Sequence, residues 1–481
     1  MNHFYNHHKI IATVGPATRS QQMLIKLYEQ GVHVIRLNFS HANYEEKEMV
    51  INLIHKLNSQ WLTRLSILMD TKWPEIRTWE KKQQSHYQAG QLVKLTINDK
   101  ACHEDDIYCG YPHLLEDIKL WDIIKIDSGL CDVEVISIES DHCMVRLLQD
   151  ATIWSYRHIN LPGKKLKLAS LSHQDQQDLI RSIQHDIHIV AMSFVRSAQD
   201  IKDLRQFRLQ HNWWSVCIFA KIENMEGLEN LEEIIQVSDG IMVARWDLWI
   251  EADIAMIPLY QQEIINKCQY YGKAIIVATQ MIESMMSHPF PTRAEIQDIA
   301  HAVQLSVDAV MLSGETAVGR YPIQAVQYMA HTVSTVQSYQ INHRKVIHPA
   351  VSDWWRDDRW IIYKHFIQSA IYLVDQIDAQ AILIFTKSWT GAKIASAYRP
   401  RVPVLACTWD SIVVEQLKIY YALYPVLLTK KLKDKDINHK MIADLLQQYH
   451  IQANHNPIVL ISDMDTMYNH HPSIQIISAW S

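Results

Sequence analysis

Short, uninterrupted runs of apolar residues recur along the first two-thirds of the chain, separated by amphipathic stretches. The runs lie at residues 9–15, 32–40, 65–70, 188–195, 216–223, 240–245, 274–280 and 309–315. Uninterrupted runs are typical of strands buried on both faces, as in a parallel sheet. Stretches such as 21–31 and 292–305 have the spacing of helices with one apolar face. Eight strands, each followed by a helix, predict a (β/α)8 barrel.

The third and fourth runs are separated by far more residues than one helix needs. Residues 74–167, within this gap, alternate apolar and polar positions, which is typical of antiparallel strands with one solvated face. A helical pattern resumes at 172–184. The pattern therefore predicts an all-β lid domain at 74–167, inserted into a barrel formed by residues 1–73 and 168–340.

A third region begins after about residue 340. Apolar runs at 379–386, 402–408, 424–429 and 457–462 alternate with helical patterns, which predicts a doubly wound α/β domain over 341–481. The predicted fold class is α/β: a (β/α)8 TIM barrel with an inserted all-β lid domain and a C-terminal doubly wound α/β domain. Three domains suit a chain of 481 residues.

Composition narrows the class of protein. A net charge of −6 argues against a nucleic-acid or anionic-membrane partner. No run approaches the roughly 20 apolar residues of a membrane span, and the N-terminus lacks the apolar core of a secretory signal. The 7 cysteines include no CxxC pair, which favours reduced thiols and a cytoplasmic location.

Polar and charged groups gather at the ends of the predicted barrel strands, where TIM barrels carry their active sites. These groups are Arg36, Asn38, Ser40, Asp70, Thr71, Lys221, Glu223, Asp247 and Thr279. Arginine and lysine hold phosphate oxygens, two carboxylates suit Mg²⁺, and the remaining oxygens suit a monovalent cation. Any one of them is as readily a solvated loop residue, but their convergence predicts metal-assisted handling of an anion. The sequence contains neither GxxxxGK[ST] nor GxGxxG.

Longer segments resemble one family. RLNFSH (36–41), DTKWPEIRT (70–78), INLPG (159–163), KIENMEG (221–227), SDGIMVARWDLW (238–249), ATQMIESM (278–285), PTRAE (291–295) and MLSGETAVGRYP (311–322) are similar, in order, to signature segments of pyruvate kinases. The resemblance extends from about residue 9 to 430. It implies a glycolytic, cytoplasmic, homotetrameric kinase that acts on phosphoenolpyruvate and ADP and requires Mg²⁺ (or Mn²⁺) and K⁺.

The resemblance also implies residue roles. The implied catalytic residues are Lys221, Arg36 and Thr279. The implied substrate contacts are Arg36, Trp246, Asp247 and Thr279, and the implied nucleotide contacts are Asn38, His41, Arg77 and Arg157. Mg²⁺ would be bound by Glu223 and Asp247, and K⁺ by Asn38, Ser40, Asp70 and Thr71. Glu75 occupies the family position where a carboxylate accompanies K⁺ dependence.

Tryptophan replaces glycine at several positions of the family pattern: Trp73, Trp79, Trp121, Trp154, Trp246, Trp249 and Trp389, with Trp61, Trp213 and Trp214 in loops that usually hold glycine. The chain has 12 glycines and 15 tryptophans. Divergence to an inactive relative, deliberate substitution, and a UGA codon for glycine translated as tryptophan each explain this; we favour the last. If tryptophan is present in the protein, glycine-specific backbone at several sites would cost about 1–3 kcal/mol each and remove most activity.

Two alternative functions remain open from the sequence. One is a catalytically impaired pyruvate kinase relative that binds metabolites, and the other is a different TIM-barrel enzyme acting on pyruvate, which leaves the inserted domain unexplained. Residues 386–393 resemble the loop that grips the phosphate of sugar-phosphate effectors, but also an ordinary strand-to-helix turn. No effector follows from the sequence.

Overall fold

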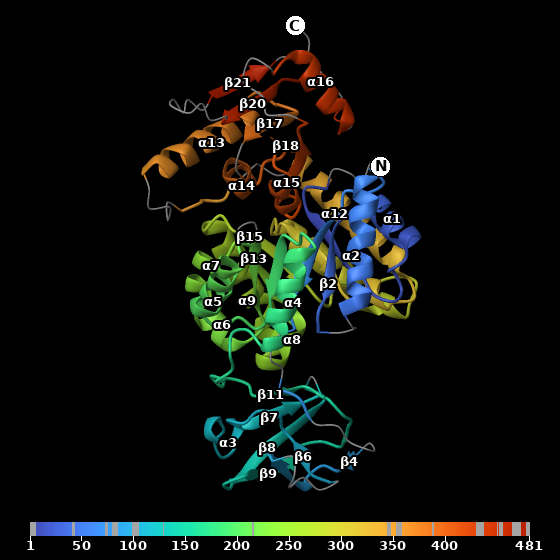
Figure 1. Ribbon diagram of the computed structural model, residues 1–481, viewed down its shortest axis with the longest axis vertical. Coiled ribbons are helices and arrows are strands. Elements are labelled where there is room, and N and C mark those ends of the chain that lie inside the picture. Colours follow the sequence, from blue (N-terminus) through green and yellow to red (C-terminus); the bar gives the residue numbers. More distant parts are fainter. Residues whose placement is uncertain are drawn as a thin grey trace.

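The protein is described here by a computed structural model. It describes residues 6–40, 44–72, 76–78, 85–98, 105–127, 129–213, 216–343, 348–352, 358–386, 389–429, 437–449, 451, 456–463 and 473–477. Along the longest axis a β-rich lid, a barrel and a C-terminal α/β domain follow one another, with the barrel in the middle (Figure 1). The predicted fold class is confirmed.

Eight parallel strands form the closed barrel, in the order β1-β16-β15-β14-β13-β12-β3-β2. Their bounds are β1 Lys9–Thr13, β2 Val32–Asn38, β3 Ser66–Asp70, β12 Ile189–Met192, β13 Cys217–Ile222, β14 Gly240–Ala244, β15 Ala274–Ala278 and β16 Ala309–Leu312. All eight correspond to the apolar runs, because both faces of each strand are covered: side chains fill the barrel inside and helices pack outside.

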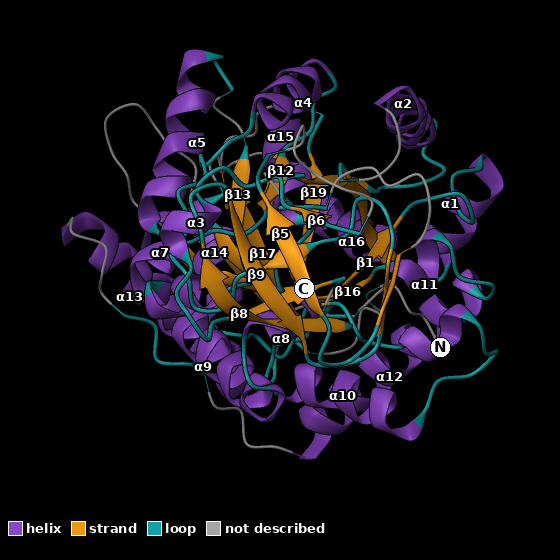
Figure 2. Cartoon of the chain, turned by 90° about the horizontal axis from the view of Figure 1, so that it is seen from below, coloured by secondary structure: helices purple, strands orange, loops and turns teal. Residues whose placement is uncertain are grey.

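Helices surround these strands in a ring, as Figure 2 shows from the lid end. They are α1 Gln21–Glu29, α2 Tyr44–Ser59, α4 His173–Gln184, α5 Ala198–Gln210, α6 Met225–Glu229, α7 Leu231–Val237, α8 Arg245–Glu251, α9 Ile257–Tyr270, α10 Arg293–Gln304, α11 Gly314–Ala317 and α12 Pro322–His343. Ser172, Ser197 and Thr292 form capping boxes at the starts of α4, α5 and α10. These hydrogen bonds satisfy free backbone N–H groups and fix where each helix begins.

The lid has its own hydrophobic core. A six-stranded sheet has the order β11-β7-β8-β9-β5-β6, and β10 pairs with β4. The elements are β4 Ser85–Tyr87, β5 Leu92–Thr96, β6 Ile107–Tyr108, α3 Leu114–Asp117, β7 Ile123–Ile126, β8 Cys131–Ile138, β9 His142–Leu147, β10 Ala151–Ile153 and β11 Ile159–Asn160. Alternating burial along β8 and β9 matches the alternating sequence pattern.

The C-terminal domain lies at the opposite end of the barrel from the lid (Figure 1). Its sheet has the order β19-β18-β17-β20-β21, with β21 antiparallel to its neighbour. The elements are α13 Asp358–Gln376, β17 Ala381–Thr386, α14 Thr390–Ala397, β18 Val404–Thr408, α15 Ser411–Leu417, β19 Leu423–Leu427, α16 His439–Gln448, β20 Ile458–Asp463 and β21 Ser473–Ile477. A buried ion pair between Arg399 and Asp308, 2.6 Å, fastens it to the barrel.

Within the part of the chain that the structure describes, the helices are too short or too polar to cross a membrane.

Candidate active site

The rim of the barrel that faces the lid carries a buried network of charges. Arg36, on β2, donates from Nε to Asp70 Oδ2 at 2.6 Å and from a terminal nitrogen to Thr13 Oγ1 at 3.1 Å. Lys221, on β13, donates from Nζ to Asp70 Oδ1 at 3.0 Å. The same ammonium lies 2.8 Å from Glu223 Oε1. Asp70 therefore joins the arginine and the lysine that the sequence predicted to hold phosphate.

Burial and pairing shift the pKa values of this network in a consistent way. Burial alone would raise the pKa of Asp70, but Arg36 and Lys221 hold it below its ordinary value. Burial alone would lower the pKa of Lys221, but Asp70 and Glu223 raise it above its ordinary value. The ammonium therefore keeps its proton at neutral pH and can offer its charge to an anion.

Ser193 completes the network, although no pattern in the sequence pointed to it. Its hydroxyl contacts Asp70 Oδ1 at 3.1 Å and the Thr71 carbonyl at 2.9 Å, and accepts from Lys221 Nζ at 2.9 Å. The Ser193 N–H donates to Thr71 Oγ1 at 3.1 Å. A serine directly after a buried strand is common, so the sequence alone does not single out Ser193. Its role follows from the position of β12 between β3 and β13 in the barrel.

Glu223 is held by backbone as well as by charge. The N–H of Phe194 donates to Glu223 Oε2 at 2.7 Å, and Phe194 has a φ of 50°. A bulky residue in this left-handed conformation is strained, typically by about 1–3 kcal/mol. This backbone conformation directs the Phe194 N–H toward the Glu223 carboxylate, and the hydrogen bond fixes the orientation of that carboxylate.

The residues that could bind Mg²⁺ are Glu223 and Asp247. Glu223 is fully buried, and its Oε1 accepts no well-aligned hydrogen bond, although the Lys221 ammonium is close. Asp247 lies in the first turn of α8, close enough to raise the pKa of Lys221. Two carboxylates that follow the ends of the neighbouring strands β13 and β14 suit a hard cation that takes its remaining ligands from substrate.

The residues predicted for K⁺ also lie together. Asn38 and Asp70 are directly opposite each other on the paired strands β2 and β3. Asn38 Oδ1 accepts from the Ser40 N–H at 3.0 Å, and Thr71 follows Asp70 with its carbonyl near Ser193. Oxygen atoms of these residues therefore gather at the ends of β2 and β3, where they could hold a monovalent cation.

A second group of contacts lies at the ends of β14 and β15. Thr279 has a φ of 64° and Gln280 a φ of 53°, which a β-branched residue such as threonine rarely adopts. Thr279 Oγ1 accepts from the Trp246 N–H at 3.0 Å and contacts the Ala278 carbonyl at 2.7 Å. This unusual turn places the hydroxyl against the first turn of α8, which also carries Asp247.

Arg245 has a structural role that the sequence did not reveal. The apolar run ended at residue 245, whereas β14 ends at Ala244 and α8 begins at Arg245. The guanidinium is buried, forms an ion pair with Asp298 at 2.6 Å, and donates to the Thr279 carbonyl. It therefore supports the turn that holds Thr279.

Comparisons with known proteins agree with this architecture. The family model for the pyruvate kinase barrel domain matches residues 5–326, and the model for the pyruvate kinase alpha/beta domain matches residues 364–474. The chain belongs to the pyruvate kinase family. A pyruvate kinase of Bacillus licheniformis is 36% identical over 86% of this chain and 71% of its own length. One of Sporosarcina psychrophila is 34% identical over 94% of this chain and 77% of its own length.

A solved structure of a pyruvate kinase from Cryptosporidium parvum superposes on the chain with a TM-score of 0.91 at 29% identity. The alignment covers 99% of this chain and 97% of that one. The match to this family includes the lid, so the inserted domain, which another TIM-barrel enzyme would leave unexplained, is accounted for.

The two lid arginines predicted to meet the nucleotide lie on paired segments. Arg77 forms an isolated antiparallel bridge with His158, and its guanidinium donates to the Tyr156 carbonyl at 2.8 Å. Arg157 lies 3.4 Å from Asp127. The structure thus brings Arg77 and Arg157 together in the lid. His41 and Glu75 lie outside the described residues.

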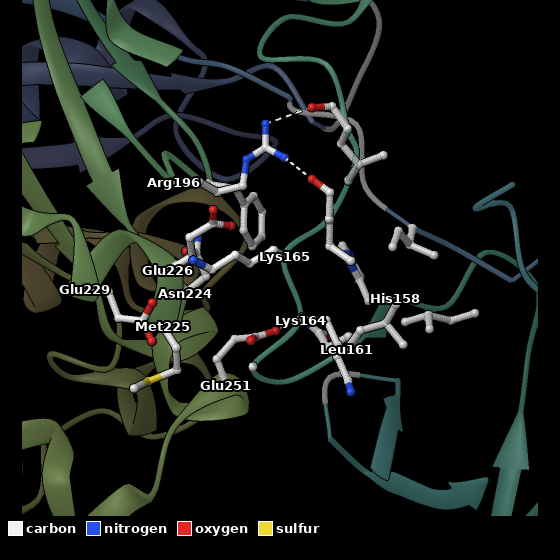
Figure 3. A pocket seen from close by; sticks show the side chains of 17 residues that line it. His158, Leu161, Lys164, Lys165, Arg196, Asn224, Met225, Glu226, Glu229 and Glu251 are labelled. Atoms are coloured by element: carbon white, nitrogen blue, oxygen red, sulfur yellow. Dashed lines mark hydrogen bonds between the residues drawn. The ribbon is translucent and has the colours of Figure 1, made fainter. Parts of the chain in front are cut away.

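A small cavity separates the lid from the barrel where the chain returns from the lid (Figure 3). Arg196, at its edge, donates to the Leu166 carbonyl at 2.6 Å and to the Leu168 carbonyl at 2.8 Å. On another wall Glu251 accepts from Asn160 of the lid at 3.3 Å, and burial raises the pKa of Glu251. These contacts anchor the returning lid segment to the barrel of this kinase fold.

The tryptophans at family glycine positions differ in backbone conformation. Trp61 and Trp121 have φ values of 60° and 71°, as expected where a glycine belongs. Trp246 and Trp249 lie in α8, and their rings meet edge to face with centroids 5.6 Å apart. Helical backbone suits any residue, so the prediction of glycine-specific strain is wrong for these two. Trp73, Trp79 and Trp214 lie outside the described residues.

Proposed function

We propose that the chain catalyses the pyruvate kinase reaction, in which the phosphoryl group of phosphoenolpyruvate passes to ADP to give pyruvate and ATP. The observation that carries this proposal is the network of Arg36, Asp70, Lys221 and Glu223 at one rim of the barrel. The family membership assigns the chemistry, a phosphotransfer, and the network supplies the charges that this chemistry needs.

Phosphoryl transfer depends mainly on positioning and on neutralising charge in a loose transition state. Arg36, held by Asp70 and Thr13, would grip oxygens of the transferring group through its remaining N–H donors. Lys221 would place its permanent charge beside the same oxygens. Ser193 and Asp70 orient that ammonium, so little reorganisation is needed when charge develops.

Thr279 would lie beside the enolate that leaves when the phosphorus–oxygen bond breaks. Its oxygen is fixed by the Trp246 N–H, and its own proton is directed to the Ala278 carbonyl. A hydroxyl fixed at this rim could pass a proton to the enolate carbon on its way to pyruvate. Arg245 keeps this hydroxyl in place through the Thr279 carbonyl.

The residues present fit both cations of the family. Glu223 and Asp247 would hold Mg²⁺ (or Mn²⁺), and Asn38, Ser40, Asp70 and Thr71 would hold K⁺. Bound Mg²⁺ would neutralise and orient the phosphate oxygens. Asp70 belongs to the predicted K⁺ set and also pairs with Arg36 and Lys221. Bound K⁺ would therefore change the electrostatic interactions within the same network.

The remaining assignments are proposals from the resemblance. Asn38, His41, Arg77 and Arg157 would contact the nucleotide, and Trp246 the substrate carboxylate. We also propose the domain bounds 1–73 with 168–340, 74–167 and 341–481, a homotetramer, and a cytoplasmic location.

A coupled assay for pyruvate tests the function directly. With phosphoenolpyruvate, ADP, Mg²⁺ and K⁺ we expect turnover, which chelation of Mg²⁺ should abolish. Replacing K⁺ by Na⁺ should lower the rate, and Glu75→Lys should remove that dependence. The impaired-relative alternative predicts no turnover by the chain as written, with recovery when Trp73, Trp246 and Trp249 are changed to glycine. No turnover by either version would refute the proposed function.

A further inference from the structure

The short helix α8 contacts the candidate active site at one end and the lid at the other. Its first turn carries Asp247, and the Trp246 N–H donates to Thr279 Oγ1 at 3.0 Å. Its last residue, Glu251, accepts from Asn160 of the lid strand β11 at 3.3 Å. Seven helical residues span about 10 Å, so a displacement of one end of α8 carries the other end with it.

Asp247 and Glu251 lie on the same face of α8. They are four residues apart, the spacing at which side chains of a helix are neighbours. Figure 3 shows the Glu251 side chain pointing toward the lid segment that contains Leu161 and Lys164. The face of α8 that carries the proposed Mg²⁺ ligand is therefore the face that meets the lid.

Packing adds a second contact between α8 and the lid. Ile250, the residue before Glu251, is buried. Gly129 lies between β7 and β8 with a φ of 82°, and a Cβ at this position would lie 3.9 Å from Ile250 Cγ2. Two segments of the lid, one before β8 and one at β11, thus meet the last turn of α8.

The environment of Glu251 strengthens its contact with the lid. Burial raises the pKa of Glu251, while hydrogen bonds from Asn160 and the Gly163 N–H and the charge of Lys125 oppose the rise. All three opposing groups belong to the lid or to the segment that returns from it. A hydrogen bond to a carboxylate that is withdrawn from water is stronger than one at the surface. Glu251 is therefore held to the lid by several groups at once.

Arg196 attaches a different part of the returning segment. It donates to the carbonyls of Leu166 and Leu168 from the turn before α5. The segment that leaves the lid is thus tied to the barrel at two places. Of these two attachments, the one made by Glu251 lies on the helix that carries Asp247.

We propose that Glu251 is a positioning residue that couples the position of the lid to that of Asp247. The proposal rests on the proposed function, because it takes Asp247 as a ligand of Mg²⁺. When Glu223 and Asp247 hold a cation, the first turn of α8 is fixed, and Glu251 then holds β11 more firmly against the barrel. The coupling is reciprocal: a closed lid favours cation binding by the same factor.

Hydrogen–deuterium exchange with and without Mn²⁺ tests the coupling, and it needs no turnover. Electron paramagnetic resonance first measures binding of Mn²⁺ to the unmodified chain and to each variant. At saturating Mn²⁺ we expect exchange in residues 159–168 of the unmodified chain to slow by about fivefold or more, the lower end of the usual range for coupled sites.

Variants of the pair separate coupling from general loosening. Glu251→Ala should bind Mn²⁺ more weakly and, at saturation, show none of this protection. Glu251→Gln keeps the length of the side chain and one acceptor oxygen, so it should retain part of the protection. Asn160→Ala should lose the protection as well, and the double variant should lose no more than either single variant, as expected for residues that act as a pair. Glu229→Gln, at the end of α6 and lining the same cavity, is the control and should behave like the unmodified chain.

The coupled pyruvate assay supplies a second readout. The proposed nucleotide contacts Arg77 and Arg157 lie in the lid, whereas Arg36 and Thr279 lie on the barrel. Glu251→Ala should therefore raise the KM for ADP by about three- to tenfold, as expected when lid closure is weakened, and change the KM for phosphoenolpyruvate much less.

The outcomes distinguish this inference from the proposed function. If Mn²⁺ protects Glu251→Ala as much as the unmodified chain, or protects neither, the inference is overturned and the proposed function stands. Additive losses in the double variant, or equal changes of both KM values, would also overturn it. An unmodified chain that binds no Mn²⁺ would refute the proposed metal site, and the inference with it.

Discussion

Lys221 Nζ lies 3.0 Å from Asp70 Oδ1, although 151 residues separate the two along the chain. They belong to β13 and β3, which are not neighbours in the barrel, since β12 lies between them. Ser193, at the end of β12, contacts both groups and closes the gap. Three successive strand ends thus hold one ammonium in place, and barrel closure is what brings them together.

Removing this ammonium tests its role in catalysis. We expect Lys221→Met to lower kcat by about 10²–10³, the cost of losing one preorganised charge at a reacting group. The coupled pyruvate assay measures it, and circular dichroism checks folding because the change leaves two buried carboxylates together. Lys56→Gln, which changes an exposed lysine on α2, serves as the control. A loss of less than about threefold would contradict the proposed role of Lys221.

Substitutions of Thr279 separate the role of its hydroxyl from the role of its backbone conformation. Thr279→Ala removes the oxygen that accepts from the Trp246 N–H, and we expect kcat to fall by about 10²-fold, in the usual range for proton transfer by a positioned group. Thr279→Ser keeps the oxygen and should retain most activity. Equal activities of the alanine and serine variants would show that the hydroxyl takes no part.

Trp61 and Trp121 should be destabilising residues. Both have positive φ and are 73% and 63% exposed, so little packing is lost when they are replaced. Trp61→Gly and Trp121→Gly should each raise the free energy of unfolding by about 1 kcal/mol. Trp249→Gly, in the helix α8, is the matched control and should lower it by about 1 kcal/mol. Urea denaturation measures the unfolding free energy of all three variants.

Mass spectrometry of the protein made by its own cells tests the codon hypothesis, which predicts glycine at positions 61, 121 and 249.

Arg196 anchors the segment that returns from the lid to the barrel. Arg196→Gln removes the hydrogen bonds to the Leu166 and Leu168 carbonyls, so the segment that returns from the lid should loosen. We expect faster limited proteolysis of this segment and a KM for ADP raised about three- to tenfold, because each lost charge-assisted bond weakens lid closure. Arg19→Gln, which breaks an exposed ion pair with Glu46, should change neither. Unchanged proteolysis of Arg196→Gln would argue against a lid anchor.

Stability should depend on pH through His348. Its Nε2 lies 2.7 Å from Asp375 Oδ2; burial alone would lower the pKa of His348, but Asp375 and the Tyr398 carbonyl raise it above 6.5. A raised histidine pKa stabilises the folded state below the unfolded pKa, and this contribution disappears as pH rises through the folded value. The difference in unfolding free energy between the unmodified chain and His348→Asn should therefore shrink on going from pH 6 to pH 8. A difference that grows over this window would contradict the pairing.

The fold was predictable from sequence because its main signal is local. A strand covered on both faces is apolar at most of its positions, and the pattern of apolar runs predicts the eight barrel strands for that reason. The capping residues Ser172 and Thr292 mark helix starts for an equally local reason. Arg36, Lys221 and Glu223 could be found because polar residues at the ends of buried strands are conspicuous.

What the sequence determined, then, was the identity and order of the elements and which strand ends carry charge. The tertiary structure decided which of these groups meet: Ser193 with Lys221, and Arg245 with Thr279. It also decided the left-handed backbone of Thr279 and Trp61. Contacts between residues far apart in the chain arise only when the barrel closes and the domains pack, and no local pattern records them.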